Sequence, residues 1–534
     1  YETIVHKYPV CWRCKTPLVL RATEQWYIMV TKLKDKMLEE ADKIVWIPDW
    51  AKERFKNWLK ELRDWVISRQ RYWGIPLPIW ECKNCKNIFI PSSVEELKSK
   101  SIVKLELKDL HKPWIDEVKL KCSKCGSVME RVPDVLDVWF DSGIAFYASL
   151  FYPKKRKLYE ELSPVDFIVE GHDQIAGWFF SLLRSGVLGF GKTPYVKVVV
   201  HGYMLDEKGR EMHKSLGNFV SVDEVVENYG ADTLRFWVLQ NTIWEDVRFS
   251  WKKLDLAFRD LNILWNIFVF ASTYMNLDRF DPTKWNLEKV EKWLKFEDRW
   301  VLSRVNRLIR DVDDLIRRSL VHEALRRIRN FIVEDLSHWY IRLIRRRVWV
   351  EAENPDKIAA YTTLYSVLKN LLLILAPITP FITEELYQQF IRPAEPKLPE
   401  SIHLMEWPKY SKEMIRDDLE EDMEYAKKIV EAKNREVEVK VLVDDPTLKS
   451  YPQTIDFLLE NNVPVKLDPK KGVTTHVKMV LVDGKYLFVG SHNWTESALS
   501  YNHEVTVKIF SSKDIVDEAE NYFMKLWVEG RPLS

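Results

Sequence analysis

The hydrophobic pattern of this chain changes twice along its length, and these changes constrain the fold more than any other feature. Up to about residue 250, short β-rich runs such as VDFIVEG and YVKVVVHGYML alternate with amphipathic helical stretches. From residue 251 to about 435 the pattern is that of successive helices. After that, strand-like alternation returns, and VKMVLVDGKYLFVGS predicts two strands around an Asp-Gly turn. The sequence therefore predicts an α/β part, an all-α part and a second, smaller α/β module.

The length and composition indicate a large soluble protein of several domains. The 534 residues allow about three or four domains of roughly 150 residues each. With 46% hydrophobic and 30% charged residues, the composition excludes a disordered or collagenous chain. No run approaches the roughly 18 consecutive apolar residues of a membrane span. The start of the sequence, YETIVHKYPV, lacks the basic and apolar regions of a signal peptide, so we expect a cytoplasmic protein without a membrane partner.

All six cysteines fall in three C-x-x-C pairs, a pattern that favours metal ligation over disulfides in a chain of this size. Two pairs have the two-knuckle form of a structural zinc site, and we predict that one zinc ion is held by Cys82, Cys85, Cys122 and Cys125. The 36 residues between these two pairs indicate a small insertion. The remaining pair, Cys11 and Cys14, is left without a second pair, so we expect it to be free or weakly metallated.

Five segments of the first 250 residues together resemble one family. They are CWRCKTPLVLRATEQWYI, WVISRQRYWGIPLPIWECKNC, PDVLDVWFDSG, VEGHDQIAGWFFSLL and HGYMLDEKGREMHKSLGN. This set resembles the class I aminoacyl-tRNA synthetases, and the DQ-x-x-GWF and DVWFDSG elements favour the isoleucyl-tRNA synthetases over the valine and leucine enzymes. The resemblance runs from residue 1 to about 433. It implies a partial class I nucleotide-binding fold and ATP-dependent charging of tRNA-Ile with isoleucine, with Mg²⁺ accompanying ATP.

The last of these segments reads as a strand, a polar loop over residues 208–218 and a helix capped by Ser221. In a doubly wound sheet, ligands bind at the carboxyl ends of strands, where a loop lysine can reach the phosphates of ATP. The family carries Lys-Met-Ser-Lys-Ser in this loop. Here the sequence is Glu211-Met212-His213-Lys214-Ser215, so the resemblance predicts that Lys214 is the ATP-loop lysine, although two of the five positions differ. The alternative is that Lys214 is an ordinary surface lysine.

The resemblance also implies an adenylate site. Glu170 and Gly171 would face the aminoacyl-adenylate, and Asp173 and Gln174 would contact its ribose or amino-acid portion. Trp178 and Trp139 would enclose the branched side chain, because indoles suit an aliphatic group; the alternative is that both simply pack in the core. Ala176 stands where relatives commonly carry arginine, which puts a phosphate or tRNA contact there in doubt.

The printed sequence lacks a His-Ile-Gly-His-like element, and the family's editing domain would precede residue 1. We therefore expect residues 1–20 to end the editing insertion and residues 21–250 to form the C-terminal half of the catalytic domain. The family's second zinc knuckle would also lie upstream, which accounts for the unpaired Cys11 and Cys14. On this interpretation the chain alone does not form an adenylate, and a separate chain carrying the N-terminal half is an expected partner.

Residues 251–434 resemble the family's helical anticodon-binding domain, with EDLSHWYIRLIRRR and LAPITPFITEELY carrying the match. Unpaired bases stack on aromatic or guanidinium planes, and arginines bind phosphates. The local cluster of arginines, with tryptophans beside it, therefore predicts tRNA contacts at Arg342, Arg345, Arg346, Arg347 and Trp339. Trp349 also lies beside this cluster. The alternative for each arginine is an ordinary exposed helix face.

Residues 435–534 contain a second pattern, His476-x-Lys478-x4-Asp483-x6-Gly490-Ser491-x-Asn493, which resembles the phospholipase D-like phosphodiesterases. The resemblance implies metal-free chemistry in which His476 attacks phosphorus. Lys478, Asp483 and Asn493 complete the catalytic set, while Ser491 and Glu504 belong to the phosphate site, Glu504 by orienting His476. Only one copy of the pattern is present, so the second histidine would come from a partner copy in a two-fold homodimer. The alternative is a degenerate copy kept only as a fold.

The sequence thus predicts an isoleucine-tRNA ligase segment joined to a phosphodiesterase-like module. One rival is a tRNA-binding module that delivers a nuclease and has no synthetase activity. Another is an artificial join whose two parts do not work together.

Overall fold

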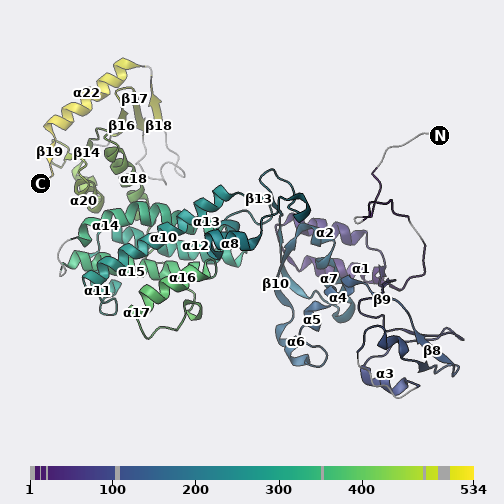
Figure 1. Ribbon diagram of the computed structural model, residues 1–534. Coiled ribbons are helices and arrows are strands. Elements are labelled where there is room, and N and C mark those ends of the chain that lie inside the picture. Colours follow the sequence, from purple (N-terminus) through teal and green to yellow (C-terminus); the bar gives the residue numbers. More distant parts are fainter. Residues whose placement is uncertain are drawn as a thin grey trace. The chain divides into compact units, whose positions relative to one another are not determined.

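The computed structural model describes residues 7–11, 14–19, 22–102, 109–349, 354–472, 477–490, 506–510 and 512–533. The chain forms two compact units. The first unit contains Tyr1–Met204 and Ile243–Val247, and the second contains Leu205–Thr242 and Arg248–Ser534. Figure 1 shows the first unit mainly in purple and blue, and the second from teal to yellow.

A three-stranded parallel sheet organises the first unit. Its order is β10 (Val165–Gly171), β11 (Tyr195–His201) and β2 (Val45–Ile47). Val198, Val199 and Val200 of β11 are at most 2% exposed, as expected when helices shield both faces of a parallel sheet, whereas Val196 near the start of the strand is exposed. One apolar core joins this sheet to three helices: α1 (Lys34–Asp42), α2 (Trp50–Lys60) and α7 (Trp178–Phe190). The predicted alternation of strands and helices is therefore present, and the paired carboxyl ends of β10 and β11 form the edge at which ligands bind in such sheets.

A small antiparallel sheet with its own core carries four of the cysteines. Its order is β6 (Ile88–Phe89), β5 (Trp80–Cys82), β8 (Val128–Arg131) and β7 (Leu120–Lys121). Trp80, only 1% exposed, lies in its core and donates its indole N–H to the carbonyl of Val118 at 2.8 Å. The insertion between the cysteine pairs contains α3 (Val94–Lys100), capped by Ser93, whose hydroxyl accepts the Glu96 N–H at 3.0 Å.

Long helices form most of the second unit (Figure 1). They are α8 (Val222–Tyr229), α9 (Ala231–Leu239), α10 (Trp251–Leu277), α12 (Phe296–Arg317), α13 (Val321–Asn330), a π-helix η6 (Phe331–Tyr340), α14 (Ile341–Val348), α15 (Pro355–Leu375), α16 (Pro380–Leu386) and α18 (Asp417–Asn434). Ser221 caps α8 as predicted, since its hydroxyl accepts the Glu224 N–H at 3.1 Å. The all-α character predicted for this part is confirmed.

Helix α15 is long and strongly apolar. Among the described residues, it is the one helix long and apolar enough to cross a membrane. However, 72% of its most apolar stretch is buried inside the protein. It packs against α10, α12 and α14, which is the behaviour of a core helix. It ends at Leu375, just before Pro377, and Pro380 opens the next helix.

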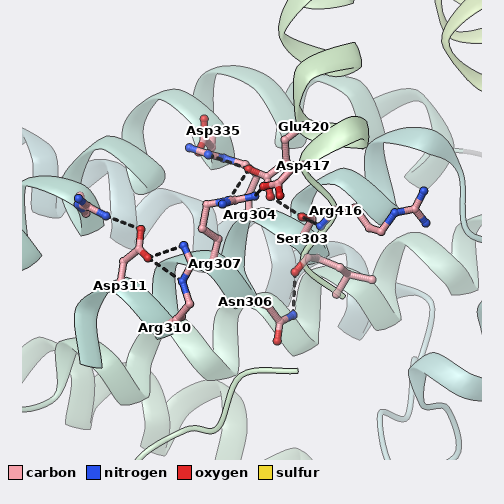
Figure 2. A network of polar contacts seen from close by, with 12 residues as sticks. Ser303, Arg304, Asn306, Arg307, Arg310, Asp311, Asp335, Arg416, Asp417 and Glu420 are labelled. Atoms are coloured by element: carbon pink, nitrogen blue, oxygen red, sulfur yellow. Dashed lines mark hydrogen bonds and ion pairs between the residues drawn. The ribbon is translucent and has the colours of Figure 1, made fainter. Parts of the chain in front are cut away.

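A polar network attaches α18 to α12 (Figure 2). The Glu420 carboxylate accepts hydrogen bonds from Arg304 at 3.1 Å and Arg307 at 2.8 Å, and from the hydroxyl of the buried Ser303. Arg304 also donates to Asp335 of η6 at 2.8 Å. Because charge-assisted bonds of this kind are directional, they fix the last helix of the bundle on its neighbours.

The C-terminal module contains two three-stranded sheets. The first pairs β14 (Val441–Val443) in parallel with β15 (Val465–Leu467), which pairs antiparallel with β19 (Arg531–Pro532). The second is antiparallel, in the order β16 (Lys478–Val482), β17 (Tyr486–Gly490) and β18 (Thr506–Ile509). Its helices are α19 (Asp445–Ser450), α20 (Pro452–Glu460) and α22 (Lys513–Glu529). The predicted hairpin is confirmed, with Asp483 and Gly484 at φ 56° and 58°, as a type I′ turn requires.

The remaining elements are short. In the first unit they are β1 (Tyr27–Ile28), η1 (Val30–Leu33), β3 (Trp65–Val66), β4 (Ser68–Arg69), η2 (Trp114–Glu117), β9 (Val135–Leu136), α4 (Val138–Gly143), α5 (Ala145–Ala148), α6 (Arg156–Leu162) and η3 (His172–Ile175). Between residues 204 and 404 the short elements are β12 (Met204–Leu205), η4 (Lys214–Leu216), β13 (Val247–Arg248), α11 (Leu287–Val290), η5 (Glu291–Trp293), η7 (Tyr387–Ile391), α17 (Arg392–Ala394) and η8 (Ile402–Leu404).

Candidate functional site

The predicted adenylate-binding residues lie at the carboxyl end of β10 and in the turn that follows it. Glu170 and Gly171 close the strand opposite Val200 and His201 of β11. A Cβ on Gly171 would lie 2.6 Å from a carboxylate oxygen of Asp173, so a side chain at this position would displace that carboxylate. Although burial opposes it, hydrogen bonds from Tyr203 and Gln174 lower the pKa of Asp173. The strand end therefore presents an ionised carboxylate, which suits an ammonium or ribose hydroxyl.

Gln174 links this turn to helix α7. Its side-chain oxygen accepts the backbone N–H of Trp178 at 3.0 Å, and a Cβ on Gly177 would lie 2.7 Å from that same oxygen. The glutamine thus satisfies one of the free N–H groups at the start of α7 while its amide donates to Asp173 at 2.7 Å. Gln174 and Asp173 are positioned as one unit.

The two predicted pocket tryptophans differ in their surroundings. Trp139 is 37% exposed and lines a cavity of about 240 Å³ in the first unit. Trp178 packs against the main apolar core and donates its indole N–H to the carbonyl of Ser142 at 3.1 Å. Of the two predicted tryptophans, Trp139 lines this cavity and Trp178 does not; Trp178 is half-buried and packs as the alternative interpretation expected.

A buried arginine in this cavity was not predicted from the sequence. Arg184 of α7 is 6% exposed, and its guanidinium lies over the Trp65 ring, 3.1 Å from the ring centroid. Burial lowers the pKa of Arg184 to about 9, against the opposing effect of Asp137. Asp137 in turn accepts the Trp65 indole N–H at 3.0 Å and lies 3.1 Å from Arg69. The only sequence signal was a single cation within the apolar run WFFSLLRSGVLGF.

Four cysteines converge on one point in the small antiparallel sheet. The Sγ atoms of Cys82, Cys85, Cys122 and Cys125 all lie within 4.8 Å of one another. Two of the separations are 3.5 Å and 3.6 Å, close to the roughly 3.8 Å between sulfurs placed tetrahedrally about 2.3 Å from zinc. Each knuckle closes with the same backbone bond, Lys86 N–H to Cys82 at 3.0 Å and Gly126 N–H to Cys122 at 2.9 Å. Hydrogen bonds from Ser127 lower the pKa of Cys125 to about 6, which favours the thiolate that binds metal. Against a backbone hydrogen bond from Asn87, burial and the neighbouring thiols raise the pKa of Cys85 to about 12. The donor set fits a structural zinc ion.

Cys11 and Cys14 are not members of this cluster in the described residues. Cys14 is exposed, and its Sγ lies 3.0 Å from the Thr16 hydroxyl, which lowers its pKa to about 7. The expectation that this pair is free or weakly metallated stays a prediction.

The predicted ATP loop belongs to the second unit and is closed at its base by two polar residues. Asp206 accepts hydrogen bonds from Asn218 at 3.0 Å and from the backbone N–H of Arg210 at 2.8 Å, and these hold its pKa well below the usual range. Asn218 also accepts the N–H of His213 at 3.0 Å. Lys214 follows, exposed, with its ammonium 5.4 Å from the centre of the Phe219 ring. No sequence pattern pointed to Asp206 and Asn218, although both are polar residues at the ends of the loop.

The predicted RNA-contact residues of the bundle separate into two groups. Arg342, Arg345 and Arg346 are exposed on α14. Trp339 is only 2% exposed, and its indole N–H points to the sulfur of Met423 at 3.3 Å. Arg347 is 7% exposed and forms ion pairs of 2.7 Å with each of three carboxylates, those of Glu297, Asp298 and Asp356.

The prediction of tRNA contacts at Trp339 and Arg347 is therefore wrong, because both side chains are buried and cannot reach an RNA. Contacts from distant segments account for this burial. Carboxylates of α12 hold Arg347, and Phe457 of α20 packs against Trp339 in the widened turn of the π-helix η6.

In the C-terminal module, Lys478 and Asp483 are the predicted catalytic residues that the structure describes. His476, Ser491, Asn493 and Glu504 lie outside the described residues. Lys478 opens β16 and pairs with Gly490, so the segment after Gly490 starts at the end of the hairpin where Lys478 lies. Asp483 follows the other end of β16, about 16 Å away at roughly 3.3 Å per residue. Asp483 therefore does not share a phosphate with Lys478, and its catalytic assignment is corrected to a turn position.

Comparison with known proteins matches these regions to three families. A model of class I tRNA synthetases (I, L, M and V) matches residues 14–250. A model of the anticodon-binding domain of tRNA ligases matches residues 298–442. The isoleucine-tRNA ligase of Saccharolobus solfataricus is 55% identical over 429 residues, which is 80% of this chain. Most of this chain is an isoleucyl-tRNA synthetase segment. The ligase of Methanothermobacter marburgensis is 50% identical over 434 residues.

The synthetase segment spans about two fifths of the length of these curated relatives, 43% and 41% respectively. Among solved structures, methionyl-tRNA synthetase of Mycobacterium tuberculosis in complex with methionyl-adenylate matches with a TM-score of 0.51 and 17% identity, over 74% of this chain and 72% of that chain. At this identity the likeness shows the class I fold and its helical domain, and no more.

The synthetase match contains both the β10 strand end and the Lys214 loop, and the anticodon-binding match contains α14. A third model, described as "Cardiolipin synthase, PLD-like domain", matches residues 410–527. It overlaps the end of the bundle, because α18 lies within both matches.

Proposed function

We propose that residues 1 to about 433 bind ATP with Mg²⁺, isoleucine and tRNA-Ile. In this proposal they supply the C-terminal half of the catalytic domain and the anticodon-binding domain of a cytoplasmic isoleucine-tRNA ligase. The observation that supports this most is the 55% identity to a curated isoleucine-tRNA ligase over 429 residues. We assign 1–20 to the end of the editing insertion, 21–250 to the catalytic domain, 251–434 to the anticodon-binding domain and 435–534 to the C-terminal module.

The chain's own residues suggest distinct tasks within that reaction. Asp173, held ionised by Tyr203 and Gln174, suits the α-ammonium of isoleucine or a ribose hydroxyl of the adenylate. Glu170 and Gly171 end the same strand, and Trp139 offers an apolar wall for the side chain. Lys214, exposed on a loop closed by Asp206 and Asn218, would offset the charge that develops on the phosphates of ATP.

Zinc would have a structural task. The four thiolates close two loops of a small sheet whose core contains few apolar residues, and small domains of this kind gain much of their stability from such an ion. Cys82 and Cys122 are themselves part of that core, so metal binding and packing would be coupled.

Equilibrium binding tests the synthetase proposal. The full chain should bind a tRNA-Ile transcript more tightly than a transcript of another tRNA, because the bundle is an anticodon-binding domain. It should also bind a non-hydrolysable isoleucyl-adenylate analogue, and Asp173→Asn should weaken this by roughly tenfold if the carboxylate holds a charged group. Binding of tRNA without any binding of the analogue would favour the rival in which the segment only delivers a nuclease.

For the C-terminal module we propose a phosphodiesterase of the phospholipase D-like type, with single-stranded nucleic acid as the preferred substrate class. The supporting observations are the family-model match and the register that pairs Lys478 with Gly490. In this proposal a ring nitrogen of His476 forms a bond to phosphorus while the bond to the leaving oxygen breaks. The matching histidine of a second copy protonates that oxygen, and water then releases the phosphate from His476.

The remaining residues of the proposed site stabilise charge. Lys478, Ser491 and Asn493 would bind the non-bridging oxygens, and Glu504 would orient His476. Because one copy of the pattern supplies one histidine, activity requires the homodimer, and it should depend on protein concentration.

A further inference from the structure

The arginines of the helical bundle are not all alike in their partners. Along α12 and α13 each of several arginines is matched by an aspartate, in the pairs Arg310–Asp311, Arg317–Asp313, Arg318–Asp314 and Arg329–Asp260. Exposed pairs of this kind neutralise the surface on which they lie. Arg342, Arg345 and Arg346 of α14 are exposed and form no ion pair with another described residue. In a chain with a net charge of +1, this single turn of helix is a local excess of positive charge.

The opposite face of α14 is held firmly. Ile344 and Val348 are 0% and 1% exposed, and Arg347 is fixed by its three carboxylates. Tyr340, directly before α14, donates its hydroxyl to Asp298 at 2.7 Å. These contacts prevent the helix from rotating, so the direction in which its three free arginines project is set by the core.

An exposed aromatic ring lies on the same side of α14 as these arginines. Trp349 stands at the C-terminus of α14 and is 63% exposed. Its spacing of three and four residues from Arg346 and Arg345 places it on their side of the helix. Its indole N–H donates to the hydroxyl of Tyr274 in α10 at 2.8 Å, and the Tyr274 ring lies 5.0 Å from that of Phe270. The indole is therefore held in one position with much of its surface open.

We propose that Trp349 is the platform on which an unpaired base of an RNA loop stacks, while Arg345 and Arg346 hold the flanking phosphates. This proposal rests on the proposed function, in which the bundle binds tRNA, and it replaces the buried Trp339. A held, exposed indole beside unpaired arginines is the combination by which proteins bind single-stranded RNA. A duplex keeps its base faces stacked within the helix, so the platform selects unpaired nucleotides. Tyr274 is a positioning residue, since it acts on the RNA only through the indole that it orients.

The test compares three probes on the full chain: a tRNA-Ile transcript, an unstructured RNA ten-mer and a blunt RNA duplex. Trp349→Ala should weaken binding of the first two roughly 5- to 150-fold and leave duplex binding unchanged. Trp349→Phe should retain most of the affinity because it keeps a ring. Phe381→Ala is the matched control, since Phe381 is also an aromatic residue of the bundle and is 68% exposed. Arg345→Ala should instead reduce the salt dependence of binding, by about one in the log-log slope.

The outcomes separate the two proposals. Unchanged tRNA and ten-mer affinity in a folded Trp349→Ala variant overturns the platform, as does an equal loss on the duplex. If the chain binds the ten-mer through Trp349 but does not prefer tRNA-Ile, the platform stands and the synthetase proposal fails. If no probe binds, both fail. Tyr274→Phe should give a smaller loss than Trp349→Ala, whereas a purely structural role for Tyr274 would lower thermal stability without affecting binding.

Discussion

Phe457 decides whether the C-terminal module and the helical bundle form one cooperative structure. It lies on α20 of the module and is 3% exposed. Its ring is 5.6 Å from that of Phe296 at the start of α12 and 6.1 Å from that of Trp339 in η6. Beside it, the Lys295 ammonium lies 3.0 Å from Glu460, the last residue of α20. The module therefore fills an apolar site on the bundle.

The expected cost of Phe457→Ala follows from this burial. A phenylalanine side chain removes roughly 150–200 Å² from water, which at about 25 cal/mol per Å² corresponds to roughly 4–5 kcal/mol. Large-to-small substitutions of buried phenylalanine cost about 3–5 kcal/mol. We therefore expect the free energy of unfolding to fall by about 4 kcal/mol. Since the ring contacts elements of both parts, the loss should appear in the bundle as well as in the module.

Hydrogen exchange of the full chain measures this directly. Phe457→Ala should speed exchange in α20 and also in η6 around Trp339. Leu487→Ala is the matched control, because Leu487 is also 3% exposed but lies on β17 of the module's other sheet. It should destabilise the module and leave η6 unchanged. If Phe457→Ala leaves exchange in η6 unchanged, the packing argument is refuted, and the rival in which the two parts are an artificial join gains support.

Three further predictions concern charge, metal and phosphoryl transfer. Burial, and then the neighbouring Asp298, raise the pKa of Glu297 from 4.5 to about 7 against the opposing effect of its ion-pair partner Arg347. The stability that the protonated form contributes is complete below pH 4.5 and is lost as pH rises through about 7. Glu297→Gln should therefore flatten urea-unfolding stability between pH 5 and pH 7.5, and an unchanged slope would show that Glu297 is ionised throughout. Metal analysis should find about one zinc per chain, abolished by Cys122→Ser and unaffected by Cys11→Ser; two equivalents would contradict the unpaired status of Cys11 and Cys14. Hydrolysis of bis-(p-nitrophenyl) phosphate should survive EDTA, fall to background in His476→Ala and drop on the order of 10²-fold in Lys478→Ala; full inhibition by EDTA would exclude the metal-free mechanism.

Features that depend on neighbours in the chain could be predicted from the sequence. The hairpin around Asp483 and Gly484 needs only two residues that tolerate positive φ between alternating strands. The cap at Ser221 and the stop of α15 before Pro377 are likewise local, because each rests on one backbone group that the next few residues satisfy or remove. The C-x-x-C spacing likewise predicted the two knuckles, since each is a local turn, whereas the small antiparallel sheet brings their four sulfurs together.

Which side chains face outward was decided only by the tertiary structure. Trp339 and Trp349 lie ten residues apart in the same basic segment, yet one is 2% and the other 63% exposed. The sequence could not separate them, because the π-helix between α13 and α14 shifts the helical phase, and because α20, more than a hundred residues later, covers Trp339. A similar reason separates Arg347 from Arg346. The carboxylates of Glu297 and Asp298 in α12 lie on one side of α14 only, so Arg347 is buried in ion pairs while Arg346 is exposed. Composition and periodicity determine that a face is basic or apolar, but long-range packing decides which of its residues reach the solvent.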